Sequence, residues 1–194
     1  MTHSYTYSHL QFRHVPDPAA VKQLCEAPSV LGIFAGVIGL PANDLLVLAA
    51  PMGLPDFSGL SGLLKRSTRE LAATVRPTEP TVLTGDGIYA HRWFRIAPAS
   101  WERFLDLSQG AWPAFEAAFD AQIMGFFRQD LSPSVTEVLL LTRYPSLAGW
   151  ERSRTDFNTQ EEKAARANFV ERQGLTQWTT VTATRLHPLS RDSL

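Results

Sequence analysis

The sequence predicts an α+β fold made of two consecutive β-α-β-β-α-β repeats. The first observation is a Y-x-H-x-x-F-R motif that occurs twice, at Tyr7–Arg13 and at Tyr89–Arg95, displaced by 82 residues (89 − 7) in a chain of 194. The second is that both copies precede the same series: a helix, an apolar run, a strand led by an acidic residue, and another helix. A fixed internal period of this kind indicates a duplicated structural unit. We therefore expect a first repeat over residues 1–84 and a second over residues 85–194.

The six elements of the first repeat follow from local patterns. Apolar and polar side chains alternate from residue 4 to residue 14, as in a half-buried strand. Asp17 and Pro18 suit the N-cap and the first turn of a helix. Leucines at helical spacing, followed by Pro77, predict a second helix. In chain order we expect strand, helix, strand, strand, helix and strand over 4–14, 18–27, 30–40, 44–50, 58–76 and 78–84.

The second repeat has the same order with longer helices. A helical rhythm predicts a helix that Pro113 should kink or divide, and the residues that follow this rhythm are Trp101, Phe104, Leu105, Ser108, Trp112, Phe115 and Phe119. Ser146 suits the N-cap of a long polar helix that ends near Gly174. The six elements are therefore expected over 87–95, 101–119, 121–130, 135–143, 146–174 and 176–186.

Composition excludes several classes of partner. The formal net charge is −1 and no run of lysine or arginine occurs, so the chain lacks the electrostatic footprint of a protein that binds nucleic acid or an anionic membrane. The longest apolar run, residues 30–40, is too short to span a bilayer, and the first residues lack a signal-peptide pattern. Cys25 is the single cysteine, so no internal disulfide is expected. We expect a cytoplasmic protein with no nucleic-acid or membrane partner.

Four stretches of the second repeat carry family information, namely Gly87–Arg95, Trp112–Ala117, Gly125–Arg128 and Leu141–Glu151. With them the second repeat resembles a NIPSNAP-type domain, whose family has no common catalytic residue set. Each repeat also has the element order of a ferredoxin-like unit. Two such units resemble the dimeric α/β-barrel superfamily, in which two four-stranded sheets face each other and the helices lie outside. The resemblance implies an intrachain α/β barrel, a pseudo-dimer within one polypeptide.

The superfamily resemblance also raises the question of haem, because some relatives are haem proteins whose axial histidine comes from a helix. None of the five histidines lies in an expected helix. His9 and His91 could supply two metal ligands, yet no third ligand stands at a supporting spacing. We therefore expect no metal and no cofactor.

The repeated motif places polar side chains on one face of each first strand. Because side chains alternate along a strand, the tyrosine, histidine and arginine share one face and the phenylalanine lies on the other, where Arg92 is an exception. If the phenylalanine face packs on the helices, the polar face points into the barrel and lines a small-molecule pocket. The candidate catalytic residues are His91, Tyr89, Arg95 and His9, with an imidazole as acid or base and an arginine to hold an oxyanion. The candidate ligand-binding residues are Tyr7, Gln11, Arg13, Trp93, Arg128 and Trp178.

More than one function is compatible with these residues. The leading hypothesis is a small-molecule enzyme or ligand-binding protein that acts on an aromatic or carbonyl-bearing metabolite without a nucleotide cofactor, through isomerase, cyclase or monooxygenase-like chemistry. A histidine beside a tyrosine on a strand is also a common packing arrangement, so a non-catalytic binding or assembly module is the alternative. A haem- or metal-binding barrel protein is the second alternative. The expected partner is a small-molecule ligand, and a homodimer of pseudo-dimers is left open.

Overall fold

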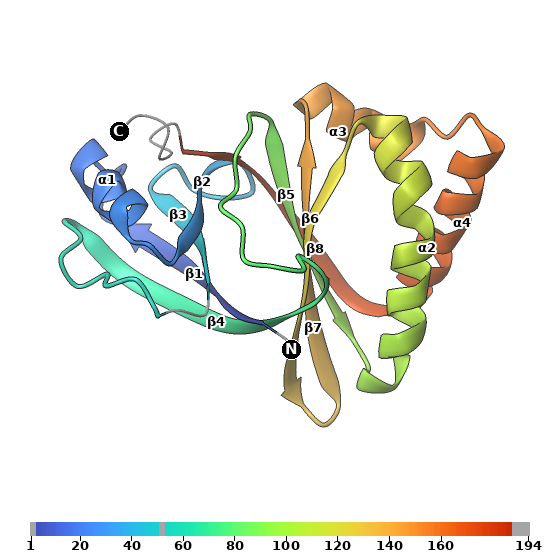
Figure 1. The fold of residues 1–194 in the computed structure, drawn as a ribbon, viewed down its shortest axis with the longest axis horizontal. Helices are drawn as coiled ribbons and strands as arrows, with labels where there is room; N and C mark the ends of the chain where they lie inside the picture. The colour runs from blue at the N-terminus through green and yellow to red at the C-terminus, as the bar shows by residue number, and fades with distance from the viewer. Residues whose placement is uncertain (1–2, 51–52, 188–194) are drawn as a thin grey trace. The chain divides into compact units, whose positions relative to one another are not determined.

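Eight strands and four α-helices form the part of the chain that the structure describes, residues 3–50 and 53–187 of a computed structural model (Figure 1). This content confirms the predicted α+β class. The chain divides into two compact units. The first takes residues 1–86 and the segment from residue 182 onward, and the second takes residues 87–181.

The first unit contains β1 (Ser4–Phe12), α1 (Pro18–Glu26), β2 (Val30–Ile38), β3 (Asp44–Ala49), β4 (Leu63–Arg76) and the end of β8 (Thr176–Leu186). Its antiparallel sheet runs in the order β4-β1-β3-β2. The last residues of β8 extend this order by pairing with β2, where Phe34 lies opposite Leu186.

Helix α1 forms where the sequence predicts it. The Asp17 carboxylate accepts a hydrogen bond from the backbone N–H of Ala20 at 2.7 Å and so caps the helix. The apolar side chains of α1 join Leu10 and Phe12 of β1 in one buried cluster. Burial of each such large side chain stabilises the unit by roughly 1.5–3 kcal/mol. The phenylalanine face of β1 therefore packs on the helix, as predicted.

The predicted helix over residues 58–76 is wrong, because the chain from Leu63 to Arg76 is strand β4. The leucines at 60, 63 and 64 have helical spacing, but of these three only Leu60 is buried, and it lies before the strand. Further on, Leu71 and Ala73 are buried, which is the period of a strand.

Pairing with β1 explains why this segment is extended. Strand β4 runs antiparallel to β1 from Ser4 opposite Ala72 to Phe12 opposite Leu63, so its backbone groups find partners along β1. The predicted strand over residues 78–84 is also wrong, since these described residues form no regular element. The first unit therefore has the order β-α-β-β-β before β8, without a second helix among its described residues.

The second unit contains β5 (Ile88–Ile96), a short 3₁₀ helix η1 (Pro98–Ser100), α2 (Trp101–Phe119), β6 (Gln122–Ser132), β7 (Val135–Tyr144), α3 (Leu147–Thr155), α4 (Gln160–Gly174) and the first part of β8. Its sheet has the order β8-β5-β7-β6. Figure 1 shows α2 and α4 side by side along one face of this sheet. Pro113 lies inside α2 and does not divide it.

The predicted long helix over residues 146–174 is two helices. Ser146 caps α3 as expected, because its Oγ accepts from the Gly149 N–H at 3.1 Å. A second cap follows at Thr159, whose Oγ1 accepts from the Glu162 N–H at 3.1 Å, while the Glu162 carboxylate accepts from the Thr159 N–H at 2.9 Å. This capping box starts α4 as a separate helix.

Aromatic side chains hold α2 on its sheet. Phe104 meets Phe94 edge-on with ring centroids 5.1 Å apart, and Trp112 meets Phe126 edge-on at 5.3 Å. Such pairs contribute roughly 0.5–1.5 kcal/mol beyond their burial. The phenylalanine face of β5 therefore packs on helices too, as the sequence predicts.

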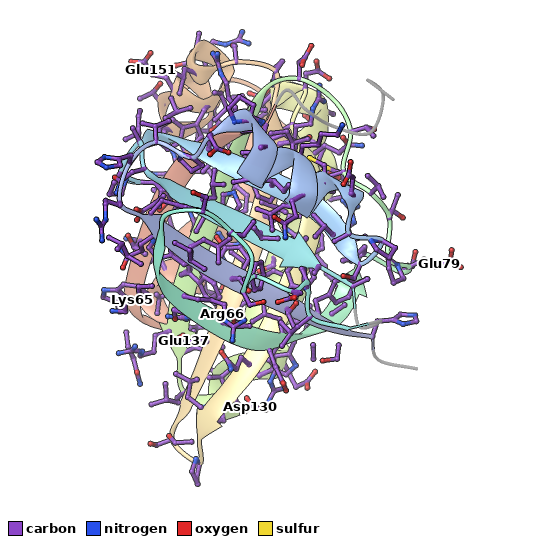
Figure 2. All side chains as sticks on the ribbon, turned by 90° about the vertical axis from the view of Figure 1, so that its left-hand side faces the viewer. Lys65, Arg66, Glu79, Asp130, Glu137 and Glu151 are labelled. Atoms are coloured by element: carbon purple, nitrogen blue, oxygen red, sulfur yellow. The ribbon has the colours of Figure 1, made fainter. Side chains whose placement is uncertain are left out.

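Acidic side chains mark positions along the second unit (Figure 2). Asp130 lies toward the turn between β6 and β7, Glu151 projects from α3 at the other end, and Glu137 lies between them on β7.

Across the described ranges, no helix has both the length and the apolar character needed to cross a membrane.

Candidate functional site

Tyr89 and His91 lie on the face of β5 that the sequence assigns to a pocket, and neither has exposed surface. Burial lowers the pKa of His91 from 6.5 to about 3, so the imidazole is neutral at neutral pH and is a weak base. Trp93 follows on the same face, is half-buried, and its backbone carbonyl accepts from Thr179 Oγ1 at 2.9 Å. Catalytic roles for Tyr89 and His91 stay predictions.

Arg95 is the centre of a small cluster on the same face. Its Nη2 donates to the Glu137 carboxylate at 2.7 Å, and Glu137 is only 3% exposed. Its guanidinium also lies 5.5 Å from the centre of the Trp178 ring. The structure thus brings together two predicted residues, Arg95 and Trp178, with an acid that the sequence marks only as the start of a strand.

An equivalent arrangement occurs in the first unit. His9 Nε2 lies 2.7 Å from Asp44 Oδ2, and Gln11 Nε2 donates to the same oxygen at 3.3 Å. Asp44 is 2% exposed. In both units, then, a buried acid at the start of the third strand binds a polar side chain of the first strand, which fixes the pairing of the two strands.

The two copies differ by a shift in strand pairing. Gln11 is the Cα partner of Asp44, whereas Arg95 is the Cα partner of Glu137, so these positions are 84 residues apart (95 − 11) rather than the 82 of the sequence motif. A shift of two residues keeps each side chain on its face of the sheet. The side chains of both motifs therefore lie on the faces of the sheet that the sequence predicts. Equivalent positions of the two motifs, however, do not have equivalent strand partners.

Three further predicted ligand-binding residues lie apart from these clusters. Tyr7 is buried on β1, and Arg13 is exposed beyond the end of that strand. Arg128 donates from Nε to Asp130 at 3.0 Å and lies 4.8 Å from the Trp101 ring centre, an arrangement that holds the start of α2 against β6. None of the three lines the cavity described next.

A cavity of about 130 Å³ lies within the second unit, between its sheet and its helices. It is on the phenylalanine face of β5, opposite the face that the sequence assigns to a pocket. We call it the arginine cavity. Its lining comprises Ala90, Arg92 and Phe94 of β5, Ile123 of β6, Leu140, Thr142 and Tyr144 of β7, Trp112 and Phe115 of α2, Ser153 and Arg154 of α3, Arg166, Phe169, Arg172 and Gln173 of α4, and Thr176 and Thr179 of β8.

Arg172 is the most deeply placed cation of the arginine cavity, with 7% of its surface exposed. Its Nη1 donates to Ser108 Oγ at 3.1 Å, and its guanidinium lies 4.9 Å from the centres of the Phe94 and Phe169 rings. Burial, with the nearby charge of Arg92 as a second cause, lowers the pKa of Arg172 to about 9. It is therefore a fixed positive charge at neutral pH.

Arg92 and Arg154 add positive charge to the same wall. Burial, followed by the charge of Arg154, lowers the pKa of Arg92 to about 10. Burial also lowers the pKa of Arg154. Arg154 and Arg166 are the exposed arginines of the lining, so the cavity meets solvent on their side. Arg92, Arg154 and Arg172 are protonated at neutral pH.

Tyr144 supplies a neutral hydrogen-bond donor among these charges. Burial raises the pKa of its phenol, while Arg154, Arg92, Arg172 and a hydrogen bond with Ser153 act in the opposite direction. The net shift is upward, so the hydroxyl keeps its proton at neutral pH. A protonated phenol beside guanidinium groups is suited to hold a carbonyl or an oxyanion.

The sequence offered one indication of this cavity. Arg92 stands between Ala90 and Phe94 on an otherwise apolar face, and a charge in that place is out of pattern for a strand packed on helices. Tyr144, Arg154 and Arg172 come from separate elements, so their convergence on Arg92 depends on how α3 and α4 pack.

The chain shares its fold with solved structures that match nearly its whole length. This agrees with the fold class that the sequence predicts, although the first unit lacks the second helix of a complete repeat among its described residues. A monooxygenase-like protein from Listeria innocua matches 97% of this chain over 96% of its own, with 11% identity and a TM-score of 0.56. A chlorite dismutase from Candidatus Nitrospira defluvii, solved in complex with imidazole, matches 96% over 92% of its own chain, with 15% identity and a TM-score of 0.56.

A NIPSNAP family protein from Agrobacterium tumefaciens strain C58 is also among the similar structures. It is 19% identical, matches 56% of this chain over 93% of its own, and has a TM-score of 0.44. No protein-family model and no curated protein matches the chain. The likeness to solved structures is one of fold, and it assigns no activity.

The residues of the arginine cavity do not fit a haem held by a helix histidine. The five histidines stand at positions 3, 9, 14, 91 and 187, none of which lies in α1 to α4 or lines the cavity. The lining also has no cysteine or methionine. Over the described ranges, no group of three or more His, Cys, Asp or Glu side chains is placed to hold a metal ion.

Proposed function

We propose that this protein binds a small organic molecule in the arginine cavity. The observation that carries the proposal is the lining itself: aromatic and aliphatic walls with a few polar groups that converge from β5, β7 and the helices. This combination is typical of small-molecule sites, where apolar walls exclude water and polar groups orient the ligand. A cavity of about 130 Å³ suits a single aromatic ring, since an engineered cavity of roughly 150 Å³ binds benzene.

The second candidate is catalysis in the same cavity. Tyr144 can donate a hydrogen bond to a carbonyl oxygen while Arg92 stabilises the negative charge that develops there. Isomerase, cyclase or monooxygenase-like chemistry on an aromatic or carbonyl-bearing metabolite fits this arrangement, and one structural neighbour is described as monooxygenase-like. The lining has no carboxylate or imidazole to act as a base, which is why binding is the first proposal. Catalysis by His91, Tyr89, Arg95 and His9 is the remaining candidate.

Ligand-observed fluorine NMR tests the proposal with 4-fluorobenzamide and 4-fluorobenzoate as probes. We expect at least one probe to bind, and Ala90→Phe to abolish that binding, because Ala90 is a buried lining residue whose enlargement fills the cavity. Gln173→Trp tests the same point from the exposed side, and Gln109→Trp, on an exposed position of α2 outside the lining, is the control. Failure of both probes to bind at about 10 mM, where a millimolar ligand is detectable, would overturn the proposal.

Retained ligand gives an independent check. Native mass spectrometry of freshly purified protein, with an absorption spectrum, should show an added small-molecule mass in the unmodified chain that is lost in Ala90→Phe. An added mass that persists in Ala90→Phe would place the ligand elsewhere in the protein.

A further inference from the structure

We propose that the arginine cavity selects an anion, and that its ligand is a small aromatic carboxylate. This inference rests on the proposed function and specifies the chemical class of the ligand. It follows from the charge balance of the lining, from the way Arg172 is held, and from the apolar side chains that line the same cavity.

The lining has positive charge without acidic residues. Four arginines line the cavity, at positions 92, 154, 166 and 172, and no Asp or Glu does. Three other arginines of the second unit have acidic partners: Arg95 pairs with Glu137, Arg103 with Glu171 and Arg128 with Asp130. Among the residues that the structure describes, the charges acting on Arg92, Arg154 and Arg172 at neutral pH are those of one another and of Arg166, since the Tyr144 phenol keeps its proton. An anion would supply the missing opposite charge.

This imbalance opposes folding unless something offsets it. Buried cations without an opposite charge are costly, and here each lowers the pKa of the next after burial itself. A bound carboxylate would relieve the repulsion between Arg92 and Arg172. Charged groups held against such a cost are more common at binding sites than elsewhere.

Arg172 is held in place before any ligand arrives. It lies between the rings of Phe94 and Phe169, and one of its N–H groups donates to Ser108. Arg92 lies over the same Phe94 ring at 6.0 Å. A guanidinium has five N–H donors in a fixed plane that matches a carboxylate, so Arg172 has donors left for a ligand and loses little freedom on binding.

The rest of the lining specifies the body of the ligand. The same lining includes the apolar and aromatic side chains of Trp112, Phe115, Ile123 and Leu140. A volume of about 130 Å³ has room for one ring but not for a fused aromatic system. The Tyr144 hydroxyl adds a neutral donor that can bind the same carboxylate or a ring substituent.

Two probes, one anionic and one neutral, provide the test. 4-Fluorobenzoate and 4-fluorobenzamide have nearly the same shape, and their dissociation constants are measured by fluorine NMR at pH 7. We expect the benzoate to bind at least about tenfold more tightly than the benzamide. This factor is what one hydrogen bond between charged partners contributes in a partly exposed site. Phenylphosphonate, with a larger tetrahedral anionic group, should bind more weakly than benzoate because a cavity of about 130 Å³ leaves little room beside one ring.

Matched variants show whether the arginines of the cavity are responsible. Arg154→Gln removes an exposed lining arginine of α3, and Arg152→Gln removes an exposed arginine of the same helix that lies outside the lining. We expect Arg154→Gln to weaken benzoate binding by about tenfold and benzamide binding much less, with Arg152→Gln resembling the unmodified protein. Arg92→Gln should also weaken benzoate binding.

The outcomes separate the two proposals. Equal binding of benzamide and benzoate, both lost in Ala90→Phe, would overturn the anion inference and leave the proposed function standing. An equal effect of Arg152→Gln and Arg154→Gln would overturn it too, because general surface charge would then explain the preference. Tighter binding of phenylphosphonate than of benzoate would overturn the carboxylate assignment. Failure of every probe to bind would overturn the proposed function and this inference together.

Discussion

Protonation of the buried His91 should make this protein unstable in mild acid. The imidazole has no exposed surface, and burial lowers its pKa from 6.5 to about 3. In the unfolded chain the same group takes up a proton near pH 6.5, so below that pH the unfolded state binds more protons than the folded state. Stability from this group is therefore fully present above pH 6.5 and is lost progressively as the pH falls toward about 3.

The size of the effect follows from the difference in pKa. One pKa unit corresponds to about 1.36 kcal/mol, so the 1.5 units between 6.5 and pH 5 amount to about 2 kcal/mol. Carried down to pH 3, the loss from this single group reaches about 5 kcal/mol. Either value is a large fraction of the roughly 5–15 kcal/mol that holds a typical domain folded.

Urea unfolding of the unmodified protein and of His91→Gln at pH 7.5, 6 and 5 measures this loss. Between pH 7.5 and pH 5, the free energy of unfolding of the unmodified protein should fall by about 2 kcal/mol more than that of the variant, whatever the variant's stability at pH 7.5. His14→Gln, which removes an exposed imidazole, is the control and should follow the unmodified protein. Parallel curves for the unmodified protein and His91→Gln would refute the reasoning, and would mean that folded His91 takes up its proton without penalty.

Two further substitutions test the packing of the units. Asp44→Ala leaves His9 and Gln11 without the buried oxygen that they share, so the free energy of unfolding at pH 7 should fall by about 1–3 kcal/mol. Glu26→Ala, at an exposed position, is the control and should change this free energy by about zero. Gly125→Ala would place a methyl group against the buried Phe127 ring and should destabilise by about 1–3 kcal/mol, whereas Gly174→Ala, at an open helical position, should stabilise by about 0.5–1 kcal/mol. Thermal melting of the last two variants gives the comparison, and a stabilising Gly125→Ala would contradict the packing of β6.

Strands were predictable where the two faces of a strand differ in polarity. On β1 and β5 the motif separates polar from apolar residues, and the apolar face packs on helices in both units. The segment that became β4 was mistaken for a helix because the leucines near its start have helical spacing. Its long pairing with β1 decides the outcome, and that contact joins residues some sixty positions apart, which no local pattern can reveal.

The candidate site was predictable only in part. Strand alternation and the repeat identified Arg95 and His9, but their acidic partners Glu137 and Asp44 depend on pairing register. The arginine cavity was missed because its charges come from one strand and two helices, and α3 and α4 were predicted as a single helix. Once Thr159 starts a new helix, the chain between them turns, and both Arg154 and Arg172 reach the same wall.

The division of β8 between the two units has a consequence for how the protein is made. Its final residues, from Ala183 to Leu186, pair with β2 of the first unit. During synthesis the ribosome releases this segment only after the whole second unit has been produced. Until then, the backbone groups of β2 that pair with β8 have no strand partner. An open edge of this kind attracts foreign strands. Premature termination near residue 86 should therefore yield an aggregation-prone fragment rather than a small independent domain.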